Sequence, residues 1–177
     1  MPRINVVDRN NASPEQRALL DAIATQLGDV PDYLGVVANS PAALRALLGL
    51  QGLATDGSLS PQTRIRIALA LAQQAGSGYF VAAHVAAGRR TGLTGNEMAA
   101  NREGCSEDAR ALVAVRLALS LARRIGDIAT AELDEARAAG YTDADIVEII
   151  AHVGLNLLTG ILGNASQIEH EGRSAPD

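Results

Sequence analysis

The sequence is poor in the residues that support redox, disulfide and base-stacking chemistry. Among its 177 residues there is one cysteine, Cys105, and no tryptophan, and aromatic side chains make up only 2%. A single cysteine allows no disulfide within the chain, no CxxC pair and no thiol-rich metal site. So few aromatic rings argue against a surface that stacks bases. The protein therefore cannot run a two-cysteine redox cycle within its own chain.

Positive charge is also scarce. The 15 basic residues are all arginine, and with 20 acidic residues the formal net charge is −5. The sequence contains no basic stripe that could neutralise phosphates, so we expect no nucleic-acid partner. The use of arginine alone, together with abundant alanine, is typical of a GC-rich bacterial genome.

Long apolar runs are missing as well. Polar residues interrupt each apolar stretch well before the roughly 20 residues that a membrane span needs. The first residues, MPRINVVDRNNASPEQ, lack the apolar region of a signal peptide. We therefore expect a cytoplasmic protein with no membrane partner. The length suits a single domain over residues 1–177, with a core at about 12–165 and polar ends.

Helix-start signals recur along the chain. Three Ser-Pro pairs, at 13–14, 40–41 and 60–61, each place an N-cap residue before a proline at the first helical position. Each pair precedes a stretch of helical apolar periodicity, and no stretch alternates as a strand does. The sequence predicts an all-α fold with helices near 14–27, 41–53, 61–75, 78–91, 95–101, 107–125, 131–139 and 143–163.

Several of these predicted helices are apolar on more than one face, among them IALALAQQ, LVAVRLALSLA and IVEIIAHVGLNLLTGIL. In a small domain such helices lie at the centre or at a subunit interface. Large side chains are few, so the helices must approach closely through alanine and glycine. We expect a homo-oligomer.

The segment LSPQTRIRIALALAQQAGSGYFVAAHVAAGRRTGLTGNE, residues 59–97, carries the most chemical information. One helix ends near Gly76, and the next begins at Ser77 and carries His84. Ser77 and His84 are two turns apart, and Phe80 and His84 one turn apart, so all three share one helix face. The backbone N–H groups at such a helix start favour an anion or a thiolate.

This segment resembles the carboxymuconolactone decarboxylase superfamily, particularly its alkylhydroperoxidase D-like branch of peroxidase-related proteins. DYLGVVANSPAALRALLGL resembles the first helices of that branch, LSPQTRIRIALALAQQAG the helix before its redox site, and AAGYTDADIVEIIAHVGLNLLTGILGNA its closing helix. The resemblance covers most of residues 32–165. It implies the all-α fold of that branch and assembly as a dimer, trimer or hexamer.

The redox-active members of the branch carry a glutamate, eleven residues, C-x-x-C, three residues and a histidine. By the resemblance, Ile65 occupies the glutamate position, Ser77 and Phe80 the cysteine positions, and His84 the histidine position. Neither serine nor phenylalanine can form the sulfenic acid and disulfide of that cycle. The resemblance therefore implies a redox-inactive member. The namesake decarboxylases also lack the cysteine pair and use acid–base chemistry, so we expect no cofactor.

Each candidate site residue has a structural alternative. His84 is the predicted catalytic group, a general acid or base, or else a buried structural histidine. Ser77 could pair with it as a nucleophile, but its position favours an N-cap. His152 and Asn156 share a face of the closing helix and could form a second wall of the site, or a core hydrogen-bonded pair. Tyr79, Phe80 and Ile65 complete the predicted substrate-binding residues.

Other polar residues have plainer interpretations. Arg64 and Arg66 point to different faces of one helix, so one should be solvated. The other could bind a substrate carboxylate near Ile65, but a surface salt bridge is the role we favour. A metal site formed by His84 and His152 is not expected, because no carboxylate at ligand spacing accompanies either. Cys105 lies in the loop NREGCSED and matches no catalytic position.

Three functions remain open at the level of sequence. The first is cofactor-free acid–base chemistry on a small organic acid or lactone, with His84 transferring the proton. The second is a non-catalytic, oligomeric ligand-binding or scaffold protein in which Phe80 and Tyr79 fill the former active site. The third, which we favour least, is a thiol peroxidase that depends on Cys105 and an external reductant.

Overall fold

The computed structural model describes residues 2–168, which form ten helices and no strand. The predicted all-α fold is confirmed. In chain order the helices are α1 (Pro14–Leu27), α2 (Asp32–Val37), α3 (Pro41–Gln51), α4 (Leu53–Asp56), α5 (Pro61–Gln74), α6 (Gly78–Arg90), α7 (Gly95–Arg102), α8 (Ala109–Arg124), α9 (Thr130–Ala138) and α10 (Asp143–Ser166).

The Ser-Pro pairs start helices as the sequence predicts. The hydroxyls of Ser13, Ser40 and Ser60 each accept the backbone N–H three residues on, and a proline follows each of them. These bonds satisfy N–H groups that a helix start leaves without an intrahelical partner. Between α5 and α6, Gly76 adopts a φ of 65°, which lets the chain turn sharply into the second helix.

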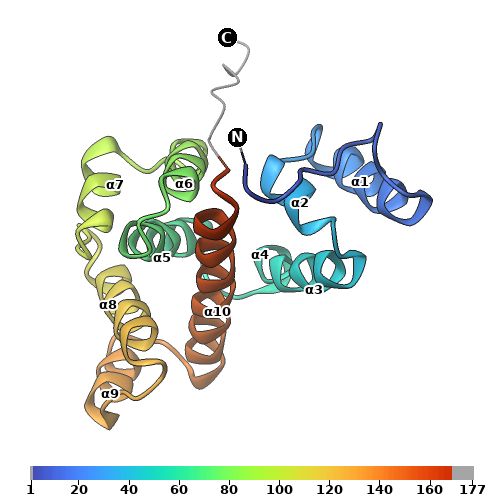
Figure 1. Cartoon of the computed structure of the whole chain (residues 1–177). Coiled ribbons are helices and arrows are strands. Elements are labelled where there is room, and N and C mark those ends of the chain that lie inside the picture. Colours follow the sequence, from blue (N-terminus) through green and yellow to red (C-terminus); the bar gives the residue numbers. More distant parts are fainter. Residues whose placement is uncertain (1, 169–177) are drawn as a thin grey trace.

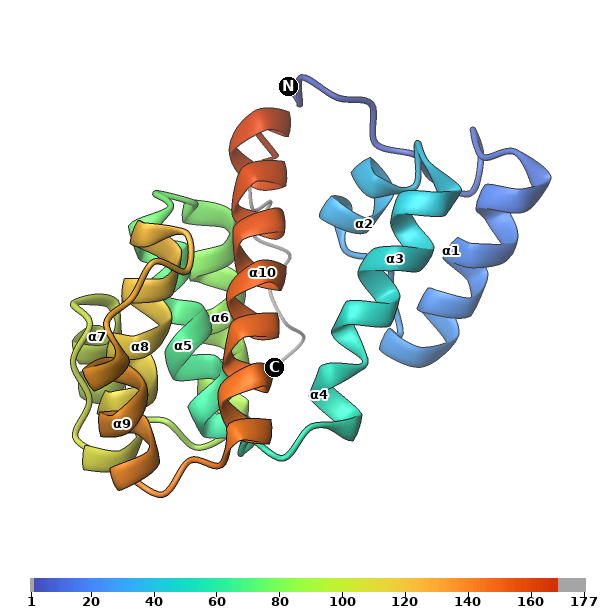
Figure 2. The ribbon, with the colours of Figure 1, turned by 90° about the horizontal axis from the view of Figure 1, so that it is seen from below.

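The longest helix, α10, lies between two groups of helices (Figures 1 and 2). On one side α5, α6, α8 and α9 pack around it, and on the other side lie α1 to α4. Each group has its own buried cluster. The C-terminal core includes Ile67, Leu71, Val115, Leu121 and Ile149. The N-terminal core comprises Val7, Leu20, Ile23, Leu34, Ala38, Leu44 and Leu47.

Helix α10 contacts both cores with side chains two residues apart in its sequence. Leu155 packs against the N-terminal core, and Leu157 packs against the C-terminal core. By length and composition α10 is also long and apolar enough to cross a membrane, although the sequence analysis predicted no such segment. Half of its most apolar window is buried against other helices, as in the central helix of a globular fold.

Two glycines of α10 allow a close approach to the junction between α5 and α6. A Cβ atom at Gly160 would lie 3.1 Å from the Cβ of Ala75. At Gly163 it would lie 2.9 Å from the Ser77 Oγ and 3.2 Å from a ring carbon of Phe80. The absence of these side chains therefore places the start of α6 directly against α10, and this contact positions the residues described next.

Candidate functional site

A cavity of about 260 Å³, here called the central cavity, lies between α5, α6 and α10 and is closed on one side by the N-terminal helices. Most of its wall is apolar. A small number of polar groups on an apolar wall is the usual composition of a small-molecule site. The lining residues are Tyr33, Gln51, Ala54, Pro61, Arg64, Ile65, Ala68, Phe80, His84, Thr91, His152, Leu155, Asn156 and Thr159.

His84 contributes a buried nitrogen to this cavity. It lies on α6, and its Nε2 atom has no hydrogen-bond partner among the described residues. Burial lowers the pKa of the His84 imidazole to about 4, and this effect outweighs the interaction with the Asn156 side chain, which raises the pKa. The imidazole is therefore neutral at pH 7, and one of its nitrogens is available to a ligand.

Two of the positions that the family resemblance assigns to redox groups, Ile65 and Phe80, are apolar and line the same cavity. The Phe80 ring is buried, lies 6.1 Å from the His84 ring between centroids and also packs against Tyr33. Ile65, on α5, is partly buried. The wall around His84 thus holds neither a thiol nor a carboxylate at these positions.

His152 faces the cavity from α10 with a carboxylate one turn before it. The His152 Nε2 lies 3.7 Å from the Glu148 Oε1, and both side chains are buried. Burial lowers the pKa of His152, the Glu148 carboxylate opposes this shift, and the Arg64 guanidinium adds to it. Asn156, a further turn along, donates from its Nδ2 to the His152 carbonyl at 2.8 Å.

Glu148 is held in place by the segment that leads into α5. Its carboxylate accepts the backbone N–H of Ser58 at 2.7 Å and that of Leu59 at 3.1 Å. The Ser58 hydroxyl also bonds to Glu148, at 2.9 Å, and to Asp145, at 2.5 Å. Glu148 was not among the predicted site residues. The spacing of four from His152 was the signal that could have identified the pair.

The side chains of the two arginines of α5 point in different directions, as their spacing predicts. Arg64 lines the cavity and donates to the Leu59 carbonyl at 3.2 Å, with no carboxylate in ion-pair range among residues 2–168. Arg66 instead forms a buried ion pair with Glu97, at 2.5 Å between Nε and Oε1. The expectation that the second arginine is solvated is therefore wrong, because Glu97 is itself buried rather than on the surface.

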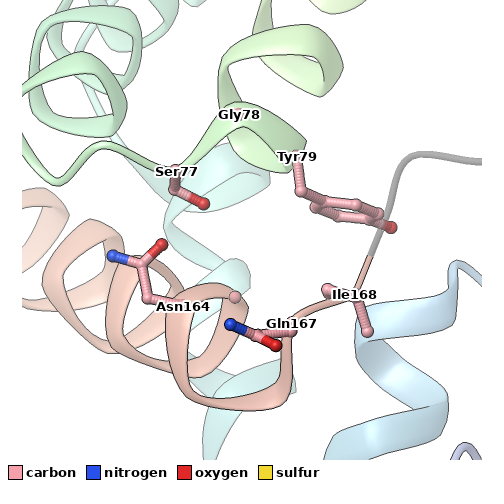
Figure 3. A pocket seen from close by; sticks show the side chains of 7 residues that line it. Ser77, Gly78, Tyr79, Asn164, Gln167 and Ile168 are labelled. Atoms are coloured by element: carbon pink, nitrogen blue, oxygen red, sulfur yellow. The ribbon is translucent and has the colours of Figure 1, made fainter. Parts of the chain in front are cut away.

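Ser77 and Tyr79 lie apart from the central cavity. Ser77 occupies the N-cap position of α6, but its hydroxyl makes no capping bond, contrary to the role we favoured. Its backbone is extended (φ −89°, ψ 91°), and its side chain packs on Gly163 of α10. Ser77 and Tyr79 line a second pocket, at the ends of α6 and α10 (Figure 3). No nucleophile–base pair therefore forms between Ser77 and His84.

The described part of the chain, residues 2–168, contains no group of three or more His, Cys, Asp and Glu side chains that could hold a metal ion. Cys105 is exposed and lies in the loop between α7 and α8. It does not line the central cavity.

Solved structures share this arrangement of helices. A peroxidase-related protein from Ralstonia eutropha JMP134 with an alkylhydroperoxidase AhpD core is 22% identical, with a TM-score of 0.81 over 95% of this chain and 91% of that chain. A peroxidase-related protein from Silicibacter sp. TM1040 is 23% identical, with a TM-score of 0.79 over 94% and 92%. The debrominase Bmp8 is 21% identical, with a TM-score of 0.72 over 95% and 92%.

These likenesses define the chain as an all-α protein with the AhpD-like fold. Residues 41–119, from α3 into α8, match the model of the carboxymuconolactone decarboxylase family, and the predicted resemblance to that family is confirmed. No curated protein sequence matches the chain.

Proposed function

We propose that this protein is a redox-inactive member of the carboxymuconolactone decarboxylase family that transfers protons, without a cofactor, on a small organic acid or lactone in the central cavity. The observation that carries the proposal is the buried Nε2 of His84, which has no hydrogen-bond partner among residues 2–168 and faces an apolar cavity. A buried polar atom without a partner is costly unless a ligand or water satisfies it.

The cavity supplies the groups that such a reaction needs. Arg64 offers donors to a carboxylate or a lactone carbonyl. Within residues 2–168 its guanidinium donates to the Leu59 carbonyl and pairs with no carboxylate, so other N–H groups remain for a ligand. His84 is neutral at pH 7 and can accept a proton, while His152 is supported by Glu148. Two imidazoles with different surroundings allow one proton to be removed and another to be delivered.

The cavity suits a small substrate with an apolar body. Its volume of about 260 Å³ is near the lower end for ligand pockets. The debrominase Bmp8, which has a similar fold, was solved in complex with 2,3,4-tribromopyrrole in a cysteine-to-alanine variant. That complex supports the idea that this fold accommodates a compact ring. It does not extend debromination to this chain, whose cavity lining contains no cysteine.

A binding screen of small carboxylic acids, lactones and enones, read by thermal shift, tests the proposal. A ligand at 100 times its dissociation constant stabilises the native state by about 2.7 kcal/mol and raises Tm by roughly 5–10 °C. We expect a hit that converts to product in the wild type, that binds but does not turn over in His84→Gln, and that loses affinity in Arg64→Gln. The matched control is Arg123→Gln, an exposed arginine that bonds Gln74 outside the cavity.

A non-catalytic ligand-binding role is the second candidate, favoured by the way the Phe80 ring fills the space beside His84. It predicts a ligand that binds equally well to the wild type and to His84→Gln and is recovered unchanged from both. Turnover that disappears with His84 excludes this second function. Binding without turnover in the wild type excludes the first.

A further inference from the structure

The second pocket, here called the helix-end pocket, has a volume of about 540 Å³ and shares no lining residue with the central cavity. Its walls are the first turn of α6 and the last turn of α10, so that one helix begins where another ends (Figure 3). A helix start presents N–H donors and a partial positive charge, whereas a helix end presents carbonyl acceptors and a partial negative charge. The pocket therefore combines donors and acceptors at short range.

The donor side is built around Ser77. This residue is only 2% exposed, yet its hydroxyl makes no hydrogen bond within residues 2–168. The residue at the same position before α5, Ser60, caps its helix in the usual way. In Figure 3 the Ser77 hydroxyl points into the space between α6 and α10. This hydroxyl is turned away from its own helix and bonds to no group within residues 2–168, so it is available to a ligand in the pocket.

The backbone beside Ser77 is open to the same ligand. No acidic side chain lies in the first turn of α6, and no side chain caps that turn. Gly78, the first helical residue, has free space on its side-chain face, since a Cβ atom there would meet nothing within 4 Å. A small oxyanion can thus reach the positive end of α6, as anions do at other helix starts.

The acceptor side belongs to α10. Asn164 donates from its Nδ2 to the Ala75 carbonyl at 2.7 Å, which fixes the orientation of its amide. Its Oδ1 is consequently turned toward Ser77 (Figure 3). The Gln167 side chain lies at the same wall, beside the carbonyls of the last helical turn. An oxyanion alone would leave these acceptors without a donor.

We propose that the helix-end pocket binds a 2-hydroxy or 2-amino carboxylate. The carboxylate is received by the Gly78 N–H and the Ser77 hydroxyl, and the neighbouring hydroxyl or ammonium group donates to the Asn164 Oδ1. Within residues 2–168 no lysine or arginine lines the pocket, so it favours a single carboxylate with its own neighbouring donor over a multiply charged phosphate. This site is independent of His84 and of the function proposed for the central cavity.

The test is an NMR titration of the ¹⁵N-labelled full chain with lactate, glycine, acetate and inorganic phosphate at matched ionic strength. We expect lactate or glycine to shift the amide signals around Ser77 and Gly78 saturably, and to bind at least about fivefold more tightly than acetate. Phosphate should bind no better than acetate. Equal affinity for acetate, stronger binding of phosphate, or no saturable shift at high millimolar lactate overturns the proposal.

Two variants assign the binding to these groups. Gly78→Pro removes one N–H donor at a position where proline suits a helix start, and Ser77→Ala removes the hydroxyl. Each should weaken binding of the preferred probe by about fivefold or more. The matched control is Gly95→Pro, at the first position of α7, where Thr94 already caps the helix. Unchanged affinity in both test variants overturns the proposal, whereas unchanged affinity in His84→Gln supports a site separate from the central cavity.

Discussion

The His152 imidazole and the Glu148 carboxylate face each other one helical turn apart on α10, with 3.7 Å between Nε2 and Oε1. Both are buried, and Glu148 is fixed by two backbone N–H groups of the segment before α5. This carboxylate does not occupy the position of the family's relay glutamate, which is Ile65 in this chain. The closing helix α10 therefore supplies a carboxylate–imidazole pair to the cavity. On α5, the position of the family's glutamate holds the apolar side chain of Ile65 instead.

Replacing Glu148 by Gln should lower the pKa of His152 further. The Glu148 carboxylate raises this pKa against the larger effect of burial, so its removal leaves burial and the Arg64 charge unopposed. An NMR titration of the His152 ring signals measures the shift. Asp145→Asn is the matched control, because Asp145 also bonds Ser58 from α10. An identical fall of the pKa in both variants would contradict a specific effect of Glu148.

Protonation of His84 should destabilise the fold as the pH falls. Its pKa is about 4 in the native state, below the unperturbed value, so the unfolded chain binds more protons between about pH 6.5 and 4. Stability therefore decreases through this window, by an amount on the order of 3 kcal/mol from this group. Urea unfolding at several pH values checks the slope. His84→Gln should flatten it, and an unchanged slope would refute the assignment.

The buried pair of Arg66 and Glu97 should matter far more than a surface pair. Burial would raise the pKa of Glu97, but hydrogen bonds from Ser106, Glu107, Asn101 and Arg66 lower it to about 2. We expect Glu97→Gln to cost about 3 kcal/mol in unfolding free energy at pH 7, because the arginine remains buried without its main partner.

The effect of this variant has its own pH signature. Because the pKa of Glu97 is lower in the native state than in the unfolded chain, its ionised carboxylate stabilises the native state at pH values above about 4.5. This stabilisation is lost as the pH falls from about 4.5 to 2. The difference in urea midpoint between wild type and Glu97→Gln should shrink over that range. Glu15→Gln, which breaks only the exposed pair with Arg45, should change stability by less than about 0.5 kcal/mol.

Helix α10 also presents an apolar stripe to solvent. Val147, Ile150, Leu158 and Ile161 are 64%, 46%, 46% and 66% exposed, and their spacing, with the exposed Gly154 between them, places them along one face of the helix. We propose that the chain forms a homo-oligomer in which a second copy covers this stripe. The double variant Leu158→Glu with Ile161→Glu should dissociate the oligomer in light-scattering measurements.

A control for the stripe is available elsewhere on the surface. Ile125 is the most exposed large apolar side chain, at 83%, and lies at the end of α8 rather than on α10. Ile125→Glu should leave the molar mass unchanged. Dissociation by this variant, or none by the double variant, would show that the stripe is not the interface.

Much of the fold could be predicted because its signals are local. The Ser-Pro pairs and the apolar periodicity define the starts of α1, α3 and α5 without reference to the rest of the chain. Helices α2 and α4 were missed because six and four residues are too few to show a helical period. Helix α10 runs to Ser166, beyond the predicted end at 163, and stops where Gln167 adopts a left-handed backbone conformation.

The site was only partly predictable because tertiary contacts decide which faces meet. Spacing alone placed His152 with Asn156, and both line the cavity with His84. Spacing also suggested that Ser77 shares a face with His84, but the extended backbone before α6 turns Ser77 toward Gly163 instead. The role of Glu148 depends on Ser58, 90 residues away in the sequence, and no local pattern reveals such a contact.

The neighbouring contacts of Leu155 and Leu157 make α10 a shared boundary between two cores. Tyr33, Gln51 and Ala54 close the central cavity from the N-terminal side, while its imidazoles belong to α6 and α10. An opening that detaches α1 to α4 without unfolding the C-terminal core thus abolishes the cavity. A ligand there holds the two halves together, so it slows amide hydrogen exchange in α2 and α3, far along the chain from the histidines that it contacts.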